Sequence, residues 1–199
     1  MIERARQTLH RILRDRRGVA AIEFAIIAPI LLSLYFVTME VSQGIEVNKK
    51  VGRAGSMIAD LVTQQQKVKK AEVEAILKIG EAILQPYNRT RPTIIITAVQ
   101  MTDTNAPEAN MVWSARLANG SFSASTPAAA TPVDVPARLK IRNTFLIKVE
   151  SQLGYAPVIT WTAGQKQALG LLAAFDGIPM NEVYYLRPRM SQTITCSDC

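Results

Sequence analysis

The sequence has little of the chemistry on which most enzymes rely. Its 199 residues include one histidine and two cysteines. The histidine, His10, lies in a basic N-terminal stretch, so no histidine-based triad can form in the region that follows. The chain also lacks a Gly-rich phosphate loop and a His-rich metal motif. We therefore predict a protein that is not an enzyme and uses no cofactor.

An enzyme that works with carboxylates alone is the remaining catalytic alternative. Such an enzyme needs acidic side chains that converge on one pocket. Asp134, Glu150 and Asp176 stand isolated in the sequence, and each is typical of a solvated or capping residue. This alternative would require the fold to bring such residues together.

Charged residues are also few, and they are unevenly placed. They make up 20% of the chain, against 48% hydrophobic residues, and the mean hydropathy is +0.10. Six arginines within residues 1–17 account for much of the net charge of +7. A basic arm can bind nucleic acid, but beside an apolar run it is more typical of a segment that sets membrane orientation. We predict no nucleic-acid partner.

The apolar run extends from Val19 to Met39, and Glu23 is its only charged residue. A helix rising 1.5 Å per residue over about 20 residues spans a ~30 Å hydrocarbon core. Pro29 lies inside the run, and membrane helices tolerate such a kink. The arginines predict that the N-terminal end stays in the cytoplasm and that residues after about 40 face outward.

Glu23 distinguishes two interpretations of this segment. Its length, and a small residue before rather than after the apolar core, favour an uncleaved signal anchor over a secretory signal. A carboxylate inside a membrane helix, however, costs about 2.5–3.5 kcal/mol at the centre and less near the end. Cleavage after Gly18 would place the Val19 ammonium about one turn from Glu23. That ammonium, or one from a staggered neighbour, could pair with the carboxylate and fix helix register.

At these residues the sequence resembles a known family. "RRGVAAIEF" followed by the apolar run resembles a type IV prepilin processing site. The spacing of Gly18, Glu23 and Phe24 is similar to that of Flp pilins and TadE-like pseudopilins, although Flp pilins usually have tyrosine after the glutamate. The resemblance implies that a membrane aspartyl prepilin peptidase cuts between Gly18 and Val19. It also implies that Glu23 and Phe24 serve subunit packing.

The remaining sequence predicts an α+β fold with a pilin-like antiparallel sheet. The helix should continue beyond residue 40 through Val41, Ile45, Val51, Ile58 and Leu61 or Val62, where glycines permit close helix packing or mark a break. A turn over 63–70 should precede an amphipathic helix over 71–84, ended by Pro86. Its predicted buried face comprises Val73, Ile76, Leu77, Gly80, Ile83 and Leu84.

Strand-like segments follow from residue 91. Three strands are expected over 93–101, 111–117 and 144–155, with 182–190 and 192–196 as a further pair. Residues 120–136 predict an exposed loop, and 162–175 a short helix. The expected organisation is a leader over 1–18, a membrane helix over 19–39, a helical part over 40–90 and a β-rich domain over 91–199.

Cys196 and Cys199 enclose two residues in "CSDC". A redox-active Cys-x-x-Cys normally opens a helix, whereas this one follows a predicted strand. Two thiolates are too few for a structural zinc site, so no metal site is predicted. A disulfide outside the cytoplasm is the favoured interpretation, and an intermolecular pair stays open.

The TadE-like resemblance continues through the order of these features, to a Tyr155-x-Pro157 corner and a late Arg-Pro-Arg over 187–189. The Asp-x-Ser-x-Ser adhesion signature of large TadG-type proteins is absent. The resemblance implies a minor pseudopilin for tight-adherence (Flp, type IVb) pilus assembly in the bacterial inner membrane, with a periplasmic domain. Implied partners are the prepilin peptidase, other pilins and pseudopilins, the inner-membrane assembly platform and the lipid bilayer. The alternative is an uncleaved single-pass envelope receptor or adaptor.

Overall fold

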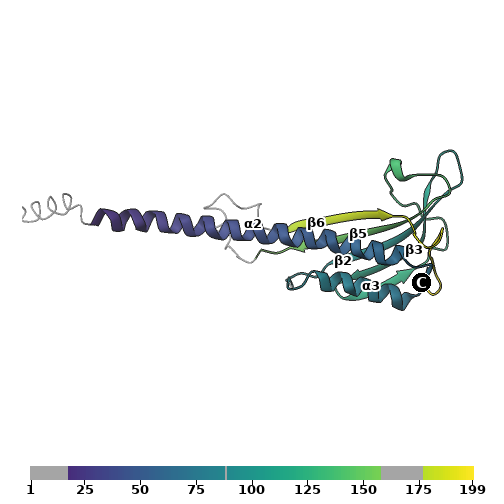
Figure 1. The fold of residues 1–199 in the computed structure, drawn as a ribbon, viewed down its shortest axis with the longest axis horizontal. Coiled ribbons are helices and arrows are strands. Elements are labelled where there is room, and N and C mark those ends of the chain that lie inside the picture. The colour runs from purple at the N-terminus through teal and green to yellow at the C-terminus, as the bar shows by residue number, and fades with distance from the viewer. Residues whose placement is uncertain (1–17, 88, 158–176) are drawn as a thin grey trace, which may run out of the picture. The chain divides into compact units, whose positions relative to one another are not determined.

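The computed structural model describes residues 18–87, 89–157 and 177–199. The chain divides into two compact units, Met1–Gln43 and Gly44–Cys199. Helix α2 (Val19–Thr63) begins in the first unit and ends in the second. Residues 1–17 of the predicted leader and the predicted helix over 162–175 lie outside the described residues. The described elements form an α+β fold, as the sequence predicts (Figure 1).

The first unit contains the apolar part of α2. Among the described residues, α2 is the one helix long and apolar enough to cross a membrane, and none of its most apolar window is buried. The hydroxyls of Ser33, Thr38 and Ser42 each donate a hydrogen bond to the carbonyl four residues earlier in the helix. These polar groups therefore find partners within the helix, as a lipid environment requires.

The second unit is built on a five-stranded antiparallel sheet with the order β4-β3-β2-β5-β6. Its strands are β2 (Thr93–Met101), β3 (Ala109–Ala118), β4 (Ser121–Ser125), β5 (Phe145–Tyr155) and β6 (Ile178–Leu186). A short 3-10 helix, η2 (Ala137–Leu139), precedes β5. A separate parallel bridge joins β1 (Lys67–Val68) to β7 (Thr195–Cys196).

The three principal predicted strands are confirmed within two residues at each end, but two other predictions are wrong. Residues 182–190 and 192–196 do not pair with each other, because β6 pairs with β5 and β7 pairs with β1. The predicted loop over 120–136 begins with strand β4. Asn119 and Gly120 both have positive φ and form the two-residue turn between β3 and β4.

Helices α2 and α3 (Lys70–Ile83) cover the same face of the sheet (Figure 1). The predicted buried face of α3 is largely confirmed, since Val73, Leu77, Gly80 and Leu84 are buried. The predicted continuation of the first helix beyond residue 40 is confirmed, with Val51, Ile58 and Val62 buried and Val41 and Ile45 exposed. The main core consists of buried residues from both helices and the sheet: Ile58, Ala59, Val62, Val68, Val73, Leu77, Ile94, Ile96, Ala98, Trp113, Ala115, Leu117, Phe145, Ile147, Val149 and Ile194.

Glycines bring the helices close to their neighbours. A Cβ on Gly55 would lie 2.8 Å from Ser151 Oγ and 2.9 Å from the Tyr184 ring. A Cβ on Gly80 would collide with the side chain of Ile58 and come within 3.0 Å of Ile94. The glycines of α2 therefore do not break the helix. They permit close packing, and the partner of Gly55 is the sheet rather than another helix.

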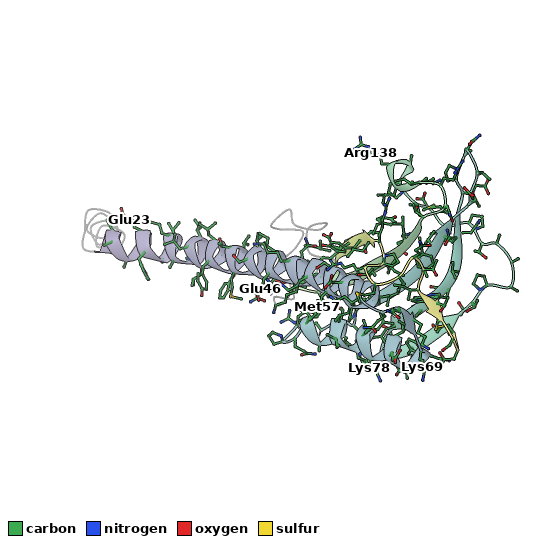
Figure 2. All side chains as sticks on the ribbon, turned by 45° about the vertical axis from the view of Figure 1, so that its right-hand side comes forward. Glu23, Glu46, Met57, Lys69, Lys78 and Arg138 are labelled. Carbon is green, nitrogen blue, oxygen red and sulfur yellow. A yellow bond between two sulfur atoms is a disulfide. The ribbon has the colours of Figure 1, made fainter. Side chains whose placement is uncertain are left out.

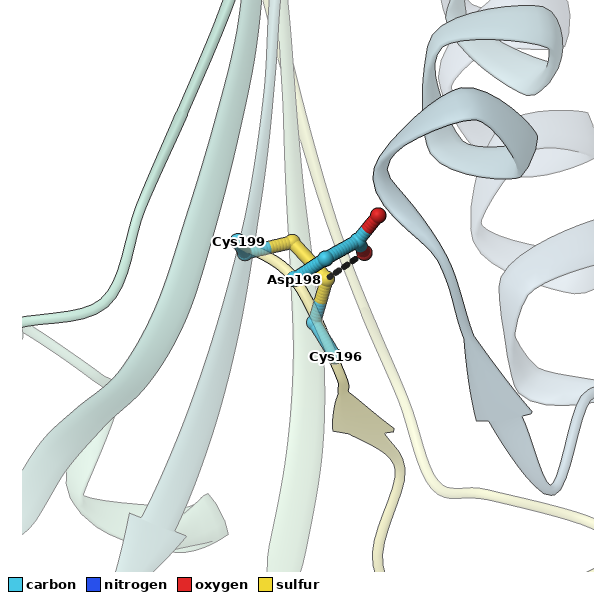
Figure 3. Close-up of side chains that lie close together, drawn as sticks. All are labelled: Cys196, Asp198 and Cys199. Carbon is cyan, nitrogen blue, oxygen red and sulfur yellow. Dashed lines mark hydrogen bonds between the residues drawn. A yellow bond between two sulfur atoms is a disulfide. The ribbon is translucent and has the colours of Figure 1, made fainter.

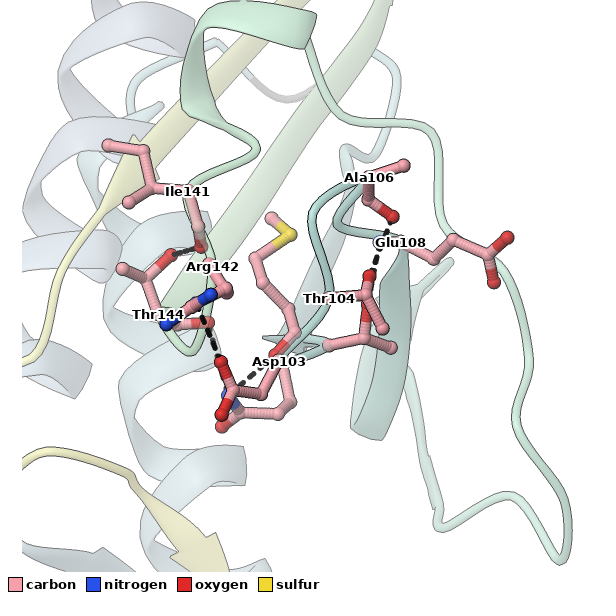
Figure 4. A network of polar contacts seen from close by, with 10 residues as sticks. Asp103, Thr104, Ala106, Glu108, Ile141, Arg142 and Thr144 are labelled. Carbon is pink, nitrogen blue, oxygen red and sulfur yellow. Dashed lines mark hydrogen bonds and ion pairs between the residues drawn. The ribbon is translucent and has the colours of Figure 1, made fainter.

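The opposite face of the sheet is covered at one end by the segment before β5. Val133, Val135 and Leu139 pack there against Val99 and Leu146. Arg142 of this segment forms an ion pair of 2.8 Å with Asp103 in the β2–β3 connection (Figure 4). Both side chains are largely exposed, so this pair fixes loop geometry more than it contributes to stability.

Candidate functional site

The predicted processing site lies at the start of α2. Gly18 immediately precedes Val19, the first residue of the helix, and both are exposed. A Cβ added to Gly18 would meet no heavy atom within 4 Å. The described part of the fold therefore leaves room for a side chain at position 18. Any requirement for glycine there would have to come from a molecule that acts on this peptide bond.

Glu23 follows one turn later and is exposed near the beginning of the helix (Figure 2). Across residues 18–87, 89–157 and 177–199, its carboxylate has no hydrogen-bond or ion-pair partner. An unpaired carboxylate in a membrane-spanning segment is unfavourable. In a membrane, a cationic partner would lower the free energy of the ionised Glu23 carboxylate.

The surface around Glu23 is apolar. Phe24 is 73% exposed, and its neighbours on all sides of the helix are also large and apolar. These exposed neighbours are Ile22, Ile26, Ile27, Ile30, Leu31, Leu32, Leu34, Tyr35 and Phe36. Continuous apolar surface of this kind marks contact with lipid or with other apolar helices. The chemistry available here is thus packing and charge pairing.

Cys196 and Cys199 are joined by a disulfide in the structure, with Cα atoms 5.6 Å apart (Figure 3). Asp198 lies between them, and the ligand atoms of the three residues fall within 4.8 Å of one another. They are the one such group of potential metal ligands among the residues described. Both sulfur atoms are used by the disulfide, so a metal could use them only after reduction.

The isolated acidic residues have ordinary roles where the structure describes them. Glu150 on β5 forms an ion pair of 3.1 Å with Lys148 on the same strand. Tyr185 on β6 lies in register with Lys148. Burial raises the pKa of the Tyr185 phenol; Lys148 lowers it in part, whereas Glu150 and Asp134 raise it further. Lys148, Glu150 and Tyr185 thus form a small polar group on adjacent strands β5 and β6. Asp176 lies outside the described residues.

Sequence reasoning missed the role of Asp198. Its carboxylate oxygen accepts a hydrogen bond of 2.7 Å from the backbone N–H of Lys70, the first residue of α3. A helix begins with N–H groups that have no partner inside the helix, and a carboxylate is well suited to bind them. The two residues are 128 positions apart. No local pattern in the sequence could have indicated this contact.

In the comparison with known protein families, one family model matches the N-terminal region. The family model described as TadE-like protein matches residues 18–60. No curated protein and no solved structure matches the chain. The matched segment contains Gly18, Glu23, Phe24, the apolar part of α2 and most of its continuation into the sheet unit. The resemblance indicated by the glycine–glutamate–aromatic spacing is therefore confirmed over residues 18–60, which are similar to the TadE-like family.

Proposed function

We propose that this protein is a non-enzymatic minor pseudopilin of tight-adherence (Flp, type IVb) pilus assembly. The observation that carries the proposal is the TadE-like match over residues 18–60, on a helix able to cross a membrane. TadE-like proteins are structural components of pili rather than enzymes. The exposed apolar surface around Glu23 is suited to co-assembly with other pilin-like helices in the bilayer.

The orientation follows from charge. Six arginines precede the apolar segment, so we place the N-terminus in the cytoplasm and the sheet unit in the periplasm, with the helix crossing the bacterial inner membrane. A phosphatase fused after Cys199 should then be active in the periplasm. Activity of a cytoplasmic reporter alone at that position would contradict the membrane assignment.

Processing is the second part of the proposal. A prepilin peptidase cuts between Gly18 and Val19, and the assembly platform then receives the shortened chain. Because a side chain at position 18 meets nothing in the described fold, Gly18→Leu should leave folding intact. Loss of cleavage in that variant would therefore report on the peptidase, which needs an unhindered backbone at the scissile bond.

Assembly is the third part. We assign Glu23 to pairing with the Val19 ammonium of a neighbouring processed subunit. A slip between the two helices would leave both charges unpaired in lipid, and for Glu23, near the end of the helix, the cost is below the about 2.5–3.5 kcal/mol of a carboxylate at the centre. The pair thus fixes register. Phe24 contributes apolar contact beside it. Neither residue is needed for hydrolysis itself.

The test combines intact mass with pilus assembly in cells. The parent protein should begin at Val19, and Gly18→Leu should retain residues 1–18 in the membrane. Glu23→Ala should be cut but fail to support pili. The matched control is Glu46→Ala, the same substitution on the same helix at a largely exposed side chain paired with Lys50. That control should be cut and should support assembly.

The outcomes separate this proposal from the alternative of an uncleaved envelope receptor or adaptor. A parent protein that retains residues 1–18 would support the alternative. If Glu23→Ala protein is cut and pili form normally, the register role of Glu23 is wrong, although processing would stand.

A further inference from the structure

The segment from Arg189 to Cys199, here called the 189–199 strap, runs past the ends of both helices. At its beginning, the Arg189 N–H donates a hydrogen bond of 2.9 Å to the carbonyl of Thr63, the last residue of α2. The Arg189 guanidinium also contacts Asp60 at 2.7 Å. This first anchor secures the strap to the last turn of α2.

A second anchor lies in the core. Ile194 is fully buried in the main cluster. Its carbonyl accepts a buried hydrogen bond of 2.8 Å from Trp113 Nε1. The Ile194 side chain is buried and its carbonyl is hydrogen-bonded without any contribution from residues 195–199. This anchor therefore does not depend on those residues.

The third anchor joins the strap to α3. Strand β7 pairs with β1, and the Ser197 N–H donates to the Val68 carbonyl at 3.2 Å. Asp198 Oδ1 accepts from the Lys70 N–H at 2.7 Å. The preceding N–H, that of Lys69, is bound by Glu72. The start of α3 is thus completed by a residue from the far end of the sheet unit.

The disulfide closes a ring around this third anchor. Cys196 and Cys199 flank Ser197 and Asp198, and Figure 3 shows the Asp198 carboxylate beside the disulfide. Both cysteines pack against the main core cluster. Asp198 itself is exposed. Ordering a free four-residue segment costs more conformational entropy than the exposed capping bond, the single Ser197 backbone bond and the partial burial of the two cysteines return, so an open ring should leave the helix start. In the closed state the disulfide already restricts the backbone of these four residues, so binding at the helix start costs less conformational entropy.

We propose that the Cys196–Cys199 pair is a redox latch for the third anchor alone. In the closed state, Asp198 caps α3 and β7 pairs with β1. In the open state, residues 195–199 leave the helix, while Arg189 and Ile194 stay bound. The first two anchors do not involve the ring, which is why the release is local.

The chemistry of the latch is thiol–disulfide exchange. Closing removes two protons and two electrons from the two thiols, and a disulfide of an oxidising protein accepts them and becomes a dithiol. Opening by a dithiol reductant such as dithiothreitol proceeds through a mixed disulfide. It ends with two protein thiols and the cyclic disulfide of the reductant.

The test is amide hydrogen exchange on the full chain in detergent micelles, before and after dithiothreitol. Opening should accelerate exchange of the Lys70 and Ser197 amides about tenfold or more, and leave the Arg189 amide and Trp113 indole within about twofold. The Cys196→Ser, Cys199→Ser double variant should behave as the reduced protein. Ser197→Ala is the matched control, because within the described residues the bond of Ser197 comes from its backbone N–H. It should match the oxidised parent.

Asp198→Ala with the disulfide closed separates the cap from the ring. It should accelerate exchange at Lys70 and leave Ser197 protected. Unchanged Lys70 exchange in the reduced protein, or in Asp198→Ala, would overturn the proposal. So would a general loss of protection that includes Trp113 and the amides of β2, since the disulfide would then support the whole fold and not a latch.

Discussion

The first part of α2 and the sheet unit use the same apolar residue types in opposite ways. Ile22 and Phe24 are 63% and 73% exposed, whereas Ile96 and Trp113 are 0% and 1% exposed. The sheet unit covers its apolar residues with its own helices and strands. Within the described residues the first part of α2 has no such cover, and lipid or other apolar helices would be suited to provide it. Apolar composition alone therefore does not distinguish the two regions. They differ in whether the apolar side chains are covered by the same chain or by something outside it.

Truncating one large aromatic residue in each region should give the largest contrast. Trp113→Ala removes a buried side chain and its bond to Ile194, and should lower the free energy of unfolding of the sheet unit by about 3–5 kcal/mol. Phe24→Ala should leave that free energy unchanged, because Phe24 is exposed. Urea unfolding in micelles, followed by circular dichroism, measures both. Equal losses in the two variants would mean that the regions are not energetically separate.

Glycine substitutions test how tightly the helices pack within the sheet unit. Gly80→Ala and Gly55→Ala insert a methyl group where neighbouring atoms leave no room, and overpacking of this kind typically costs about 1–3 kcal/mol. Gly154→Ala is the control, since a Cβ there meets nothing within 4 Å. The same unfolding measurement applies. Stabilisation of the Gly80 variant would show that helix propensity outweighs the contact with Ile58.

Substitution of Tyr185 should have the smallest effect on stability, and it tests how stability depends on pH. Burial raises the pKa of Tyr185 above its ordinary value of 10.0, so the folded state favours the protonated phenol. The resulting stability is fully present below the unfolded pKa and is lost as pH rises through the folded pKa. Between pH 9 and pH 11, roughly the range around a tyrosine pKa, the parent should lose more stability than Tyr185→Phe. Parallel curves for the two proteins would contradict the raised pKa.

Much of the fold could be predicted because its elements have clear local patterns. The β-branched run over 93–101 became the central strand β2, and the apolar spacing of Val73, Leu77 and Gly80 gave the buried face of α3. The family resemblance came from Gly18, Glu23 and Phe24, which lie in the segment that the family model matches. The roles of these three residues stay predictions, since they depend on partners outside the chain.

The remainder could not be predicted, because it depends on pairing between distant segments. The two-residue strand β7 pairs with an equally short β1, and strands of this length leave no periodic signal. Strand β4 was missed because three of its five residues are serine and one is alanine, although the Asn119–Gly120 turn before it is a typical hairpin signal. Strand propensity alone did not predict a strand in this segment, because it takes no account of the packing of Phe122 and Ala124 on the core.

The strap also determines the order in which the fold can be completed. Lys70 and Asp198 are 128 positions apart, and Trp113 and Ile194 are 81 apart. Chains are synthesised from the N-terminus, and contacts between distant positions form slowly. The inner faces of α2 and α3 are therefore made before β5, β6 and the strap that cover or fasten them. Until β5, β6 and the strap have been synthesised, Ile58 and Leu77 can be covered only by β2, β3 and β4, so their core stays incomplete.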